Sequence, residues 1–210
     1  MVTMTLDLTA ELAATRLLAV IRGTDTAAAI ATGTALLAEG VRVVEVALTT
    51  PGALDAIAVI RATAPPGSVV GAGTVLTPAD VADVVAAGAQ FVVTPAVVDS
   101  IPEAVRRDLP VAVGALTPTE AYAAVRAGAS VVKLFPASVG GPAYLKALRD
   151  PFPDIPFVAV GGVGLAELPG YLAAGAIAVG VGGPLVGDAA SGGDLDALQD
   201  RARAYVAATS

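Results

Sequence analysis

Short apolar runs recur along the chain, and each is followed by a longer, alanine-rich stretch with scattered polar residues. The runs are rich in β-branched residues and too short for helices, so they predict buried strands, and the stretches between them predict helices. Successive runs start 20 to 28 residues apart, which leaves room for one helix after each strand. The expected strands begin near Leu18, Val41, Val69, Phe91, Val111, Val131, Phe157 and Ile177.

Glycine marks the end of four of these helices. Gly40, Gly88, Gly128 and Gly175 each lie between an alanine-rich stretch and the next apolar run. Glycine is the usual residue just after a helix because it adopts the left-handed conformation at no steric cost.

Threonine–proline pairs predict where three helices begin, at residues 50–51, 77–78 and 117–118. Threonine caps the helix, and proline occupies the first helical position, where no N–H group is needed. Asp80 and Glu120 lie three residues after the second and third threonine, as in capping boxes.

Eight successive strand–helix units predict a (β/α)8 TIM barrel. A doubly wound open sheet is the alternative, and the number of repeats favours closure. We expect a single domain over residues 1–210. It comprises an extra N-terminal helix at about 8–17, a barrel core at 18–187 and a C-terminal helix at 194–208.

Hydrophobic residues make up 55% of the chain, and the mean hydropathy is +0.76. Residues 168–187 carry no charge, but two prolines and six glycines there predict a helix, a strand and a glycine loop, not a transmembrane helix. The net charge of −7, without a basic stripe, argues against nucleic-acid binding. The chain has no secretory-signal pattern at its start. We therefore expect a cytoplasmic protein without membrane or nucleic-acid partners.

The chain contains neither histidine nor cysteine. Disulfides, thiol catalysis and an ordinary zinc site are therefore not expected. Any acid–base chemistry has to come from carboxylates, lysine, tyrosine or water.

Lys133 lies inside the apolar run at residues 131–136 and is one of only two lysines, the other being Lys146 in an expected surface helix. Burial disfavours the charged form of an amine, so a lysine in such a strand is a candidate nucleophile. The alternative is a stem packed on apolar surface with the amine reaching water.

Glu45 is the only carboxylate within a strand-like run, at residues 43–48. It lies five residues after Gly40, as Lys133 lies five residues after Gly128. The two residues thus occupy equivalent points of strands two and six, and in a closed barrel both can point inward at one level. A structural ion pair is possible, but such pairs contribute little net stability. A catalytic role explains both residues better.

Two glycine loops, at residues 161–164 and 180–183, follow the expected strands seven and eight. Loops at these positions are the usual phosphate site of such barrels, so Gly161, Gly162, Gly182 and Gly183 are candidate phosphate-binding residues.

Further candidates end other strands at the same mouth. Arg22 ends strand one and can bind a carboxylate or phosphate through two hydrogen bonds, or it is a charge at the rim. Thr74 offers a hydroxyl after strand three, and Pro95 follows strand four. Phe135 is two residues beyond Lys133, so it points the same way and can form a wall of the pocket.

Taken together, these residues resemble the aldolases that cleave 2-keto-3-deoxy-6-phosphogluconate (KDPG), its galactonate epimer and 4-hydroxy-2-oxoglutarate (KHG). The similarity extends from the first strand to Val186. Its most specific segments are VEV at 44–46, GAGTV at 71–75, VKLFP at 132–136 and VGGV at 160–163.

The resemblance implies a class I aldolase, a carbon–carbon lyase that needs no metal or other cofactor. Lys133 would form a Schiff base and Glu45 would move protons, while Arg22 and Thr74 orient the keto-acid carboxylate. The products would be pyruvate and glyceraldehyde 3-phosphate, or pyruvate and glyoxylate from KHG. Family members commonly form trimers, so a homotrimer is also implied.

Three positions depart from the family pattern. Thr49 replaces an arginine found in many members at this substrate-binding position, and Gly183 replaces a serine of the phosphate loop. Val160 replaces the threonine of gluconate-type members and is similar to the phosphogalactonate branch. Two other hypotheses remain: a phosphate-binding isomerase or thiamine-phosphate-synthase-like transferase without imine chemistry, and a non-catalytic oligomeric barrel.

Overall fold

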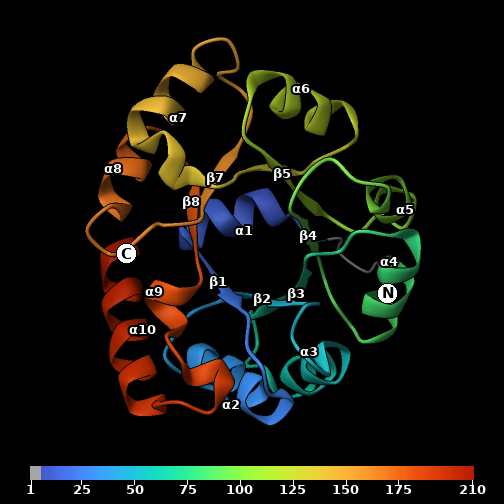
Figure 1. The fold of residues 1–210 in the computed structure, drawn as a ribbon, viewed down its shortest axis with the longest axis vertical. Helices are drawn as coiled ribbons and strands as arrows, with labels where there is room; N and C mark the ends of the chain where they lie inside the picture. Colours follow the sequence, from blue (N-terminus) through green and yellow to red (C-terminus); the bar gives the residue numbers. More distant parts are fainter. Residues whose placement is uncertain (1–5) are drawn as a thin grey trace.

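The computed structural model describes residues 6–210, in which eight parallel strands form a closed barrel in chain order (Figure 1). The last strand pairs with the first, which rules out the open sheet and confirms the predicted barrel. The strands are β1 (Leu17–Ile21), β2 (Val43–Ala47), β3 (Val69–Gly73), β4 (Val92–Thr94), β5 (Val111–Ala115), β6 (Val131–Leu134), β7 (Phe157–Val160) and β8 (Ala178–Val181).

Helices surround the barrel, at least one after each strand (Figure 1). They are α2 (Thr26–Ala38), α3 (Ala53–Thr63), α4 (Pro78–Ala86), α5 (Ser100–Arg106), α6 (Pro118–Arg126), α7 (Gly141–Arg149), α8 (Leu168–Ala173), α9 (Gly183–Val186) and α10 (Leu195–Thr209). Short 3₁₀ turns, η1 (Ala137–Val139) and η2 (Ala189–Ser191), follow β6 and α9.

Most of the predicted helix ends are confirmed. The four glycines expected after helices all have positive φ, between 90° and 99°. Helices α4 and α6 begin with the two expected capping boxes.

The predicted start at residues 50–51 is wrong. Helix α3 begins at Ala53, with Gly52 in the left-handed conformation at its N-cap. The Thr50 side chain is buried and accepts a hydrogen bond from the Gly23 N–H at 3.2 Å. It therefore bonds a distant loop instead of capping its own helix.

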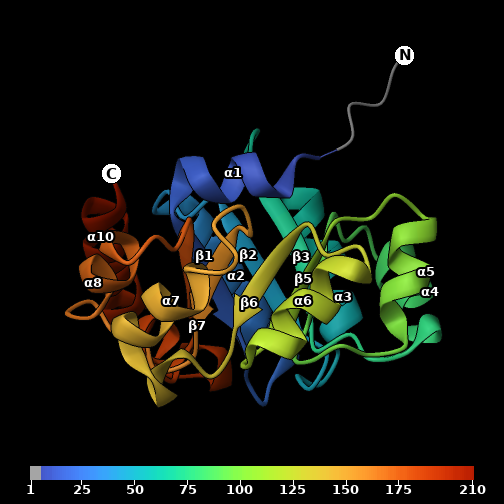
Figure 2. The same cartoon turned by 90° about the horizontal axis from the view of Figure 1, so that it is seen from above.

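The extra N-terminal helix is present as α1 (Leu8–Thr15), and it lies across one end of the barrel (Figure 2). Its buried Leu8 and Leu12 pack with residues that fill the barrel, such as Phe91. The helix ends before the predicted residue 17, because Arg16 turns into the left-handed conformation and Leu17 already belongs to β1. Helix α1 thus closes the N-terminal end of the strands, which leaves the other end open.

The uncharged stretch 168–187 contains helix α8, strand β8 and the short helix α9, as predicted. Between residues 6 and 210, no helix is long and apolar enough to cross a membrane. Residues 1–5, on which the prediction of no secretory signal partly depends, lie outside the described part of the chain.

Candidate active site

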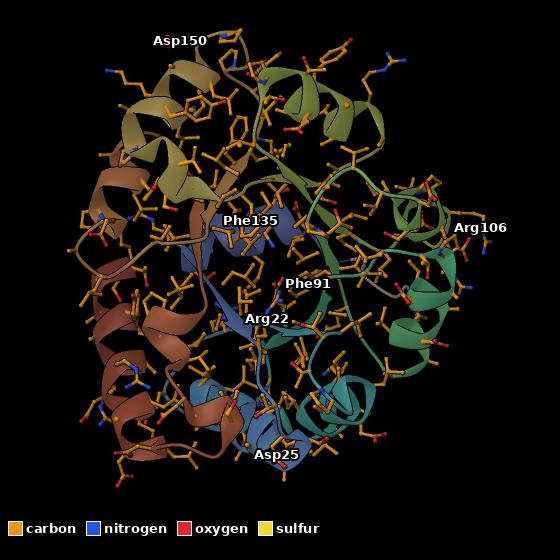
Figure 3. All side chains as sticks on the ribbon, in the orientation of Figure 1. Arg22, Asp25, Phe91, Arg106, Phe135 and Asp150 are labelled. Carbon is orange, nitrogen blue, oxygen red and sulfur yellow. The ribbon has the colours of Figure 1, made fainter. Side chains whose placement is uncertain are left out.

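A cavity of about 430 Å³ opens at the C-terminal ends of the strands. It brings together nine of the residues singled out from the sequence, and Figure 3 shows Arg22 and Phe135 within the ring of strands. These nine are Arg22, Thr74, Pro95, Lys133, Phe135, Gly161, Gly162, Gly182 and Gly183.

Lys133 projects into this cavity from β6, where it pairs in register with Gly114 of β5 and Val158 of β7. The residue is buried, with 9% of its surface exposed. Its Nζ atom lies 4.9 Å from the centroid of the Phe135 ring. The ring therefore limits one side of the space in which the amine can move.

Glu45 lies on β2, on the opposite side of the barrel, and is 2% exposed. Burial raises the pKa of Glu45 above its ordinary value, while the positive charges of Lys133 and Arg22 oppose this increase. The Oε2 atom has no hydrogen-bond partner in the described residues. The carboxyl group is thus poorly stabilised as an anion and holds a proton more readily than an exposed carboxyl group does.

The strand register places Glu45 and Lys133 at one level. The register of paired residues can be traced from Glu45 around the barrel in either direction to β6. Through β1, β8 and β7, the residue at the level of Glu45 is residue 137. Through β3, β4 and β5, it is residue 129. The difference of eight is the stagger of a closed (β/α)8 barrel, and Lys133 lies midway.

The two groups lie on opposite strands of the barrel and make no direct ion pair. None of the ion pairs found between residues 6 and 210 joins Glu45 to Lys133, although the two interact electrostatically. A direct structural ion pair, the alternative raised by the sequence, is therefore not what the structure contains. Lys133 lines the cavity, whereas Glu45 is not among its lining residues.

The ends of β1 and β3 are linked at the mouth of the cavity. Arg22 Nη2 donates a hydrogen bond to Thr74 Oγ1 at 3.3 Å. Thr74 has a φ of 62°, which is uncommon for a β-branched residue and strains the backbone. A cation and a hydroxyl group are thus held side by side, as donors that a carboxylate can use.

The glycine loops follow β7 and β8, and the second of them lies beside the end of β1. Gly161 and Gly162 have φ values of 93° and 73°, and a Cβ on Gly161 would lie 3.0 Å from the Phe135 ring. Side chains are therefore excluded by conformation and by space. At Gly183 a Cβ would meet nothing within 4 Å, so there is space for a side chain at this position. Because glycine has none, the cavity stays open beside this loop.

Comparison with known proteins agrees with this geometry. Residues 8–200 match the family model described as KDPG and KHG aldolase. The chain belongs to this family. A probable 2-dehydro-3-deoxy-6-phosphogalactonate aldolase of Rhizobium meliloti (strain 1021) is 37% identical over 194 residues, which is 91% of this chain and 90% of the relative.

Two solved structures extend the comparison. KDPG aldolase from Legionella pneumophila, with pyruvate captured as a covalent carbinolamine, has a TM-score of 0.85 and 30% identity, and the match covers 96% of this chain and 98% of that one. A cube-shaped protein cage designed by fusing symmetric oligomeric domains has a TM-score of 0.85 and 34% identity, over 92% of this chain and 71% of that one.

Thr49, at one of the positions where the chain departs from many aldolases of the family, lies outside the cavity. It is exposed in the turn after β2 and is not among the lining residues. Val160, the second departure, lines the cavity and is 5% exposed. Its methyl groups occupy the space that Gly180 leaves free, because a Cβ on Gly180 would lie 2.6 Å from Val160 Cγ2.

Some residues of the site were not found from the sequence. Val20, Val163 and Pro184 line the cavity, but aliphatic residues of a strand or loop carry no chemical signal for such a role. Gly73 lies against the Glu45 carboxyl group. This contact joins a backbone position of β3 to a side chain of β2, so no local sequence pattern marks it.

Proposed function

We propose that this protein is a class I aldolase that cleaves a 2-keto-3-deoxy-6-phospho sugar acid to pyruvate and glyceraldehyde 3-phosphate. Cleavage of KHG to pyruvate and glyoxylate is a second activity expected of the same site. The observation that carries the proposal is a buried amine that lines the cavity and a buried carboxyl group at the same level on the opposite strand of the barrel, in a member of the KDPG and KHG aldolase family.

Lys133 provides the nucleophile. Its neutral amine adds to the C2 ketone of the substrate, and loss of water gives an iminium ion that accepts an electron pair. Glu45 removes the proton of the C4 hydroxyl group, directly or through water. The C3–C4 bond then breaks and the aldehyde leaves. The electron pair of the broken bond stays with C3 and is accepted by the iminium ion, which becomes an enamine.

Glu45 also completes the cycle. The carboxyl group, now protonated, returns its proton to C3 of the enamine, and hydrolysis of the resulting iminium ion releases pyruvate and Lys133. A carboxyl group whose pKa is raised by burial is suited to both steps, because it accepts a proton more readily than an ordinary carboxylate and can donate it again.

The remaining residues would hold the two ends of the substrate. Arg22 and Thr74 would bind the carboxylate, and this task falls to them because Thr49 does not line the cavity. Backbone N–H groups of the loops at Gly161–Gly162 and Gly182–Gly183 would bind the phosphate. Val160 offers no hydroxyl to the sugar chain, which favours a substrate of the galactonate type.

A homotrimer is part of the proposal. It rests on the family resemblance, on the similarity to a cage of symmetric oligomeric domains and on the exposed apolar side chains of the outer helices, including Tyr122 and Val125. Light scattering after size-exclusion chromatography should give three times the mass of the chain, and a monomer would contradict it.

The phosphorylated substrate also agrees with the cytoplasmic location expected from the sequence, because its charge prevents passage through membranes.

The decisive experiment traps the imine. Borohydride added with pyruvate should attach a reduced pyruvyl group to Lys133 and not to the exposed Lys146, as located by peptide mass spectrometry. Lys133→Ala should give no adduct and no release of pyruvate from the gluconate or galactonate phosphates or from KHG. An unmodified wild-type protein would favour the isomerase or transferase hypothesis, and an adduct without turnover would favour a non-catalytic barrel.

A further inference from the structure

Gly73, the last residue of β3, is packed directly against the carboxyl group of Glu45. A Cβ on Gly73 would lie 2.8 Å from Oε1 of Glu45 and 3.0 Å from its Cδ. The next neighbour, the Cα of Ala47, would be 3.6 Å away, which is an ordinary contact. The carboxyl group is therefore the one close obstacle to a side chain at this position.

The backbone gives no other reason for glycine at residue 73. Gly73 is not among the glycines with positive φ, and it pairs with Ala47 and Val93 in regular strand register. Alanine could adopt this conformation without strain. In Gly161 and Gly162, by contrast, positive φ alone requires glycine.

The neighbouring glycine in β3 has a different surrounding. A Cβ on Gly71 would lie 2.4 Å from the Phe91 ring, which fills the interior of the barrel below the site. Gly71 thus makes space for a core side chain, whereas Gly73 makes space for a titratable one.

We propose that Gly73 is a positioning residue for the proton-transferring carboxyl group. Its missing side chain provides the space in which Oε1 of Glu45 lies, and so sets the distance between the carboxyl group and an imine on Lys133. This inference rests on the aldolase function proposed above. Because Glu45 is 2% exposed, a methyl group on residue 73 has to displace the carboxyl group within the barrel and not toward solvent.

Gly73→Ala should therefore impair proton transfer and spare imine formation. Misplacement of a catalytic group by about 1 Å costs on the order of a hundredfold in rate, so kcat for cleavage should fall by about ten- to a hundredfold. Borohydride trapping of pyruvate on Lys133 should stay near the wild-type level. Exchange of the pyruvate methyl protons in D2O, followed by NMR, should slow in parallel with kcat because it requires the same proton transfer.

Two further glycine variants serve as controls. Gly170→Ala adds a methyl group at an exposed position of α8 that does not line the cavity, 3.2 Å from Pro142 Cγ, and it should leave exchange and trapping unchanged. Gly71→Ala should lower the melting temperature, because its methyl group enters the space of Phe91. If Gly73→Ala exchanges protons at the wild-type rate, or loses trapping and melting temperature together with exchange, the proposal is wrong.

A double-mutant cycle with Glu45→Asp tests the contact itself. Aspartate is one methylene shorter, so its carboxyl group does not reach the methyl group added by Gly73→Ala. In the Glu45→Asp background, Gly73→Ala should slow exchange by less than about twofold, since the effects of contacting residues are not additive. Equal factors in both backgrounds would overturn the proposal. A wild-type protein that forms no adduct with pyruvate would instead contradict the aldolase function.

Discussion

Glu45 and Lys133 are the buried charged residues of the described chain, and neither has a direct ionic partner. A buried carboxyl group without a hydrogen-bond partner at Oε2 costs stability. Proteins retain such groups where activity requires them. At the scale of single residues, the site is thus maintained at the expense of the fold.

Glu45→Gln should make this conflict measurable. The pKa of Glu45 is raised above 4.5, so the folded protein binds this proton more tightly than the unfolded chain does. The associated stability is fully present below the unfolded pKa and is lost as the pH rises through the folded pKa. Glutamine has no proton to lose, so its advantage in unfolding free energy should grow in urea titrations as the pH rises above the ordinary carboxyl pKa.

The same variant should lose about 10²- to 10⁴-fold in kcat, the usual contribution of a general acid–base group. Trapping of pyruvate on Lys133 should persist. An advantage in stability that does not change with pH would show that Glu45 is not the titrating group.

Arg22→Met should change both binding and pH dependence. Loss of a charge-assisted hydrogen bond worth about 1.5–3 kcal/mol should raise KM for the keto acid by about ten- to a hundredfold. Because the Arg22 charge lowers the pKa of Glu45, its removal should move the acidic limb of kcat/KM to higher pH.

Arg126→Met, an exposed substitution on α6, is the matched control for Arg22→Met and should change neither KM nor the pH dependence of kcat/KM. If the acidic limb of the kcat/KM profile does not move in Arg22→Met, Arg22 does not act on Glu45.

At the scale of elements, two of the helices begin with complete capping boxes. In α6 the Thr117 hydroxyl accepts a hydrogen bond from the Glu120 N–H, and the Glu120 carboxylate accepts from the N–H groups of Thr117 and Leu116. These bonds lower the pKa of Glu120. The α6 cap therefore stabilises the fold above the ordinary carboxyl pKa and loses strength in acid.

Thr117→Ala should lower the unfolding free energy by about 1 kcal/mol, the typical cost of losing an N-cap. Chemical denaturation at neutral pH is the measurement. Thr119→Ala, two residues further along the same helix, removes a hydroxyl group without a cap bond and should have no comparable effect. Equal losses for both variants would contradict the assignment, and kcat should be unaffected in either.

At the scale of the whole molecule, the two ends of the barrel have different tasks. Helix α1 lies across the N-terminal end of the barrel (Figure 2), where Leu8 and Leu12 are buried, and the cavity occupies the C-terminal end. Stability and chemistry are therefore separated along the barrel axis.

Leu12→Ala tests this separation. Removal of a fully buried leucine side chain should cost about 2–5 kcal/mol, measured by urea unfolding, while kcat at a temperature well below the transition stays near the wild-type value. Thr15→Ala on the same helix is the control. A lower kcat in folded Leu12→Ala, but not in Thr15→Ala, would show that the two ends of the barrel are coupled.

The sequence alone determined the number of strand–helix units and most of the helix ends, and it singled out the two buried charged residues of the barrel. These features depend on neighbours within a few residues, such as the glycine after a helix or a charge inside an apolar run. The spacing of Glu45 and Lys133 from their glycines also predicted their common level, because every repeat enters the barrel in the same way.

Only the tertiary structure decided what depends on residues far apart in the chain. Thr50 failed to cap α3 because its hydroxyl bonds Gly23, which lies 27 residues away. Closure of the barrel set the gap between Glu45 and Lys133, and it brought Gly73 against the Glu45 carboxyl group. A glycine that makes room for another strand's side chain leaves no local pattern, since its function is a contact that exists only after the strands have paired.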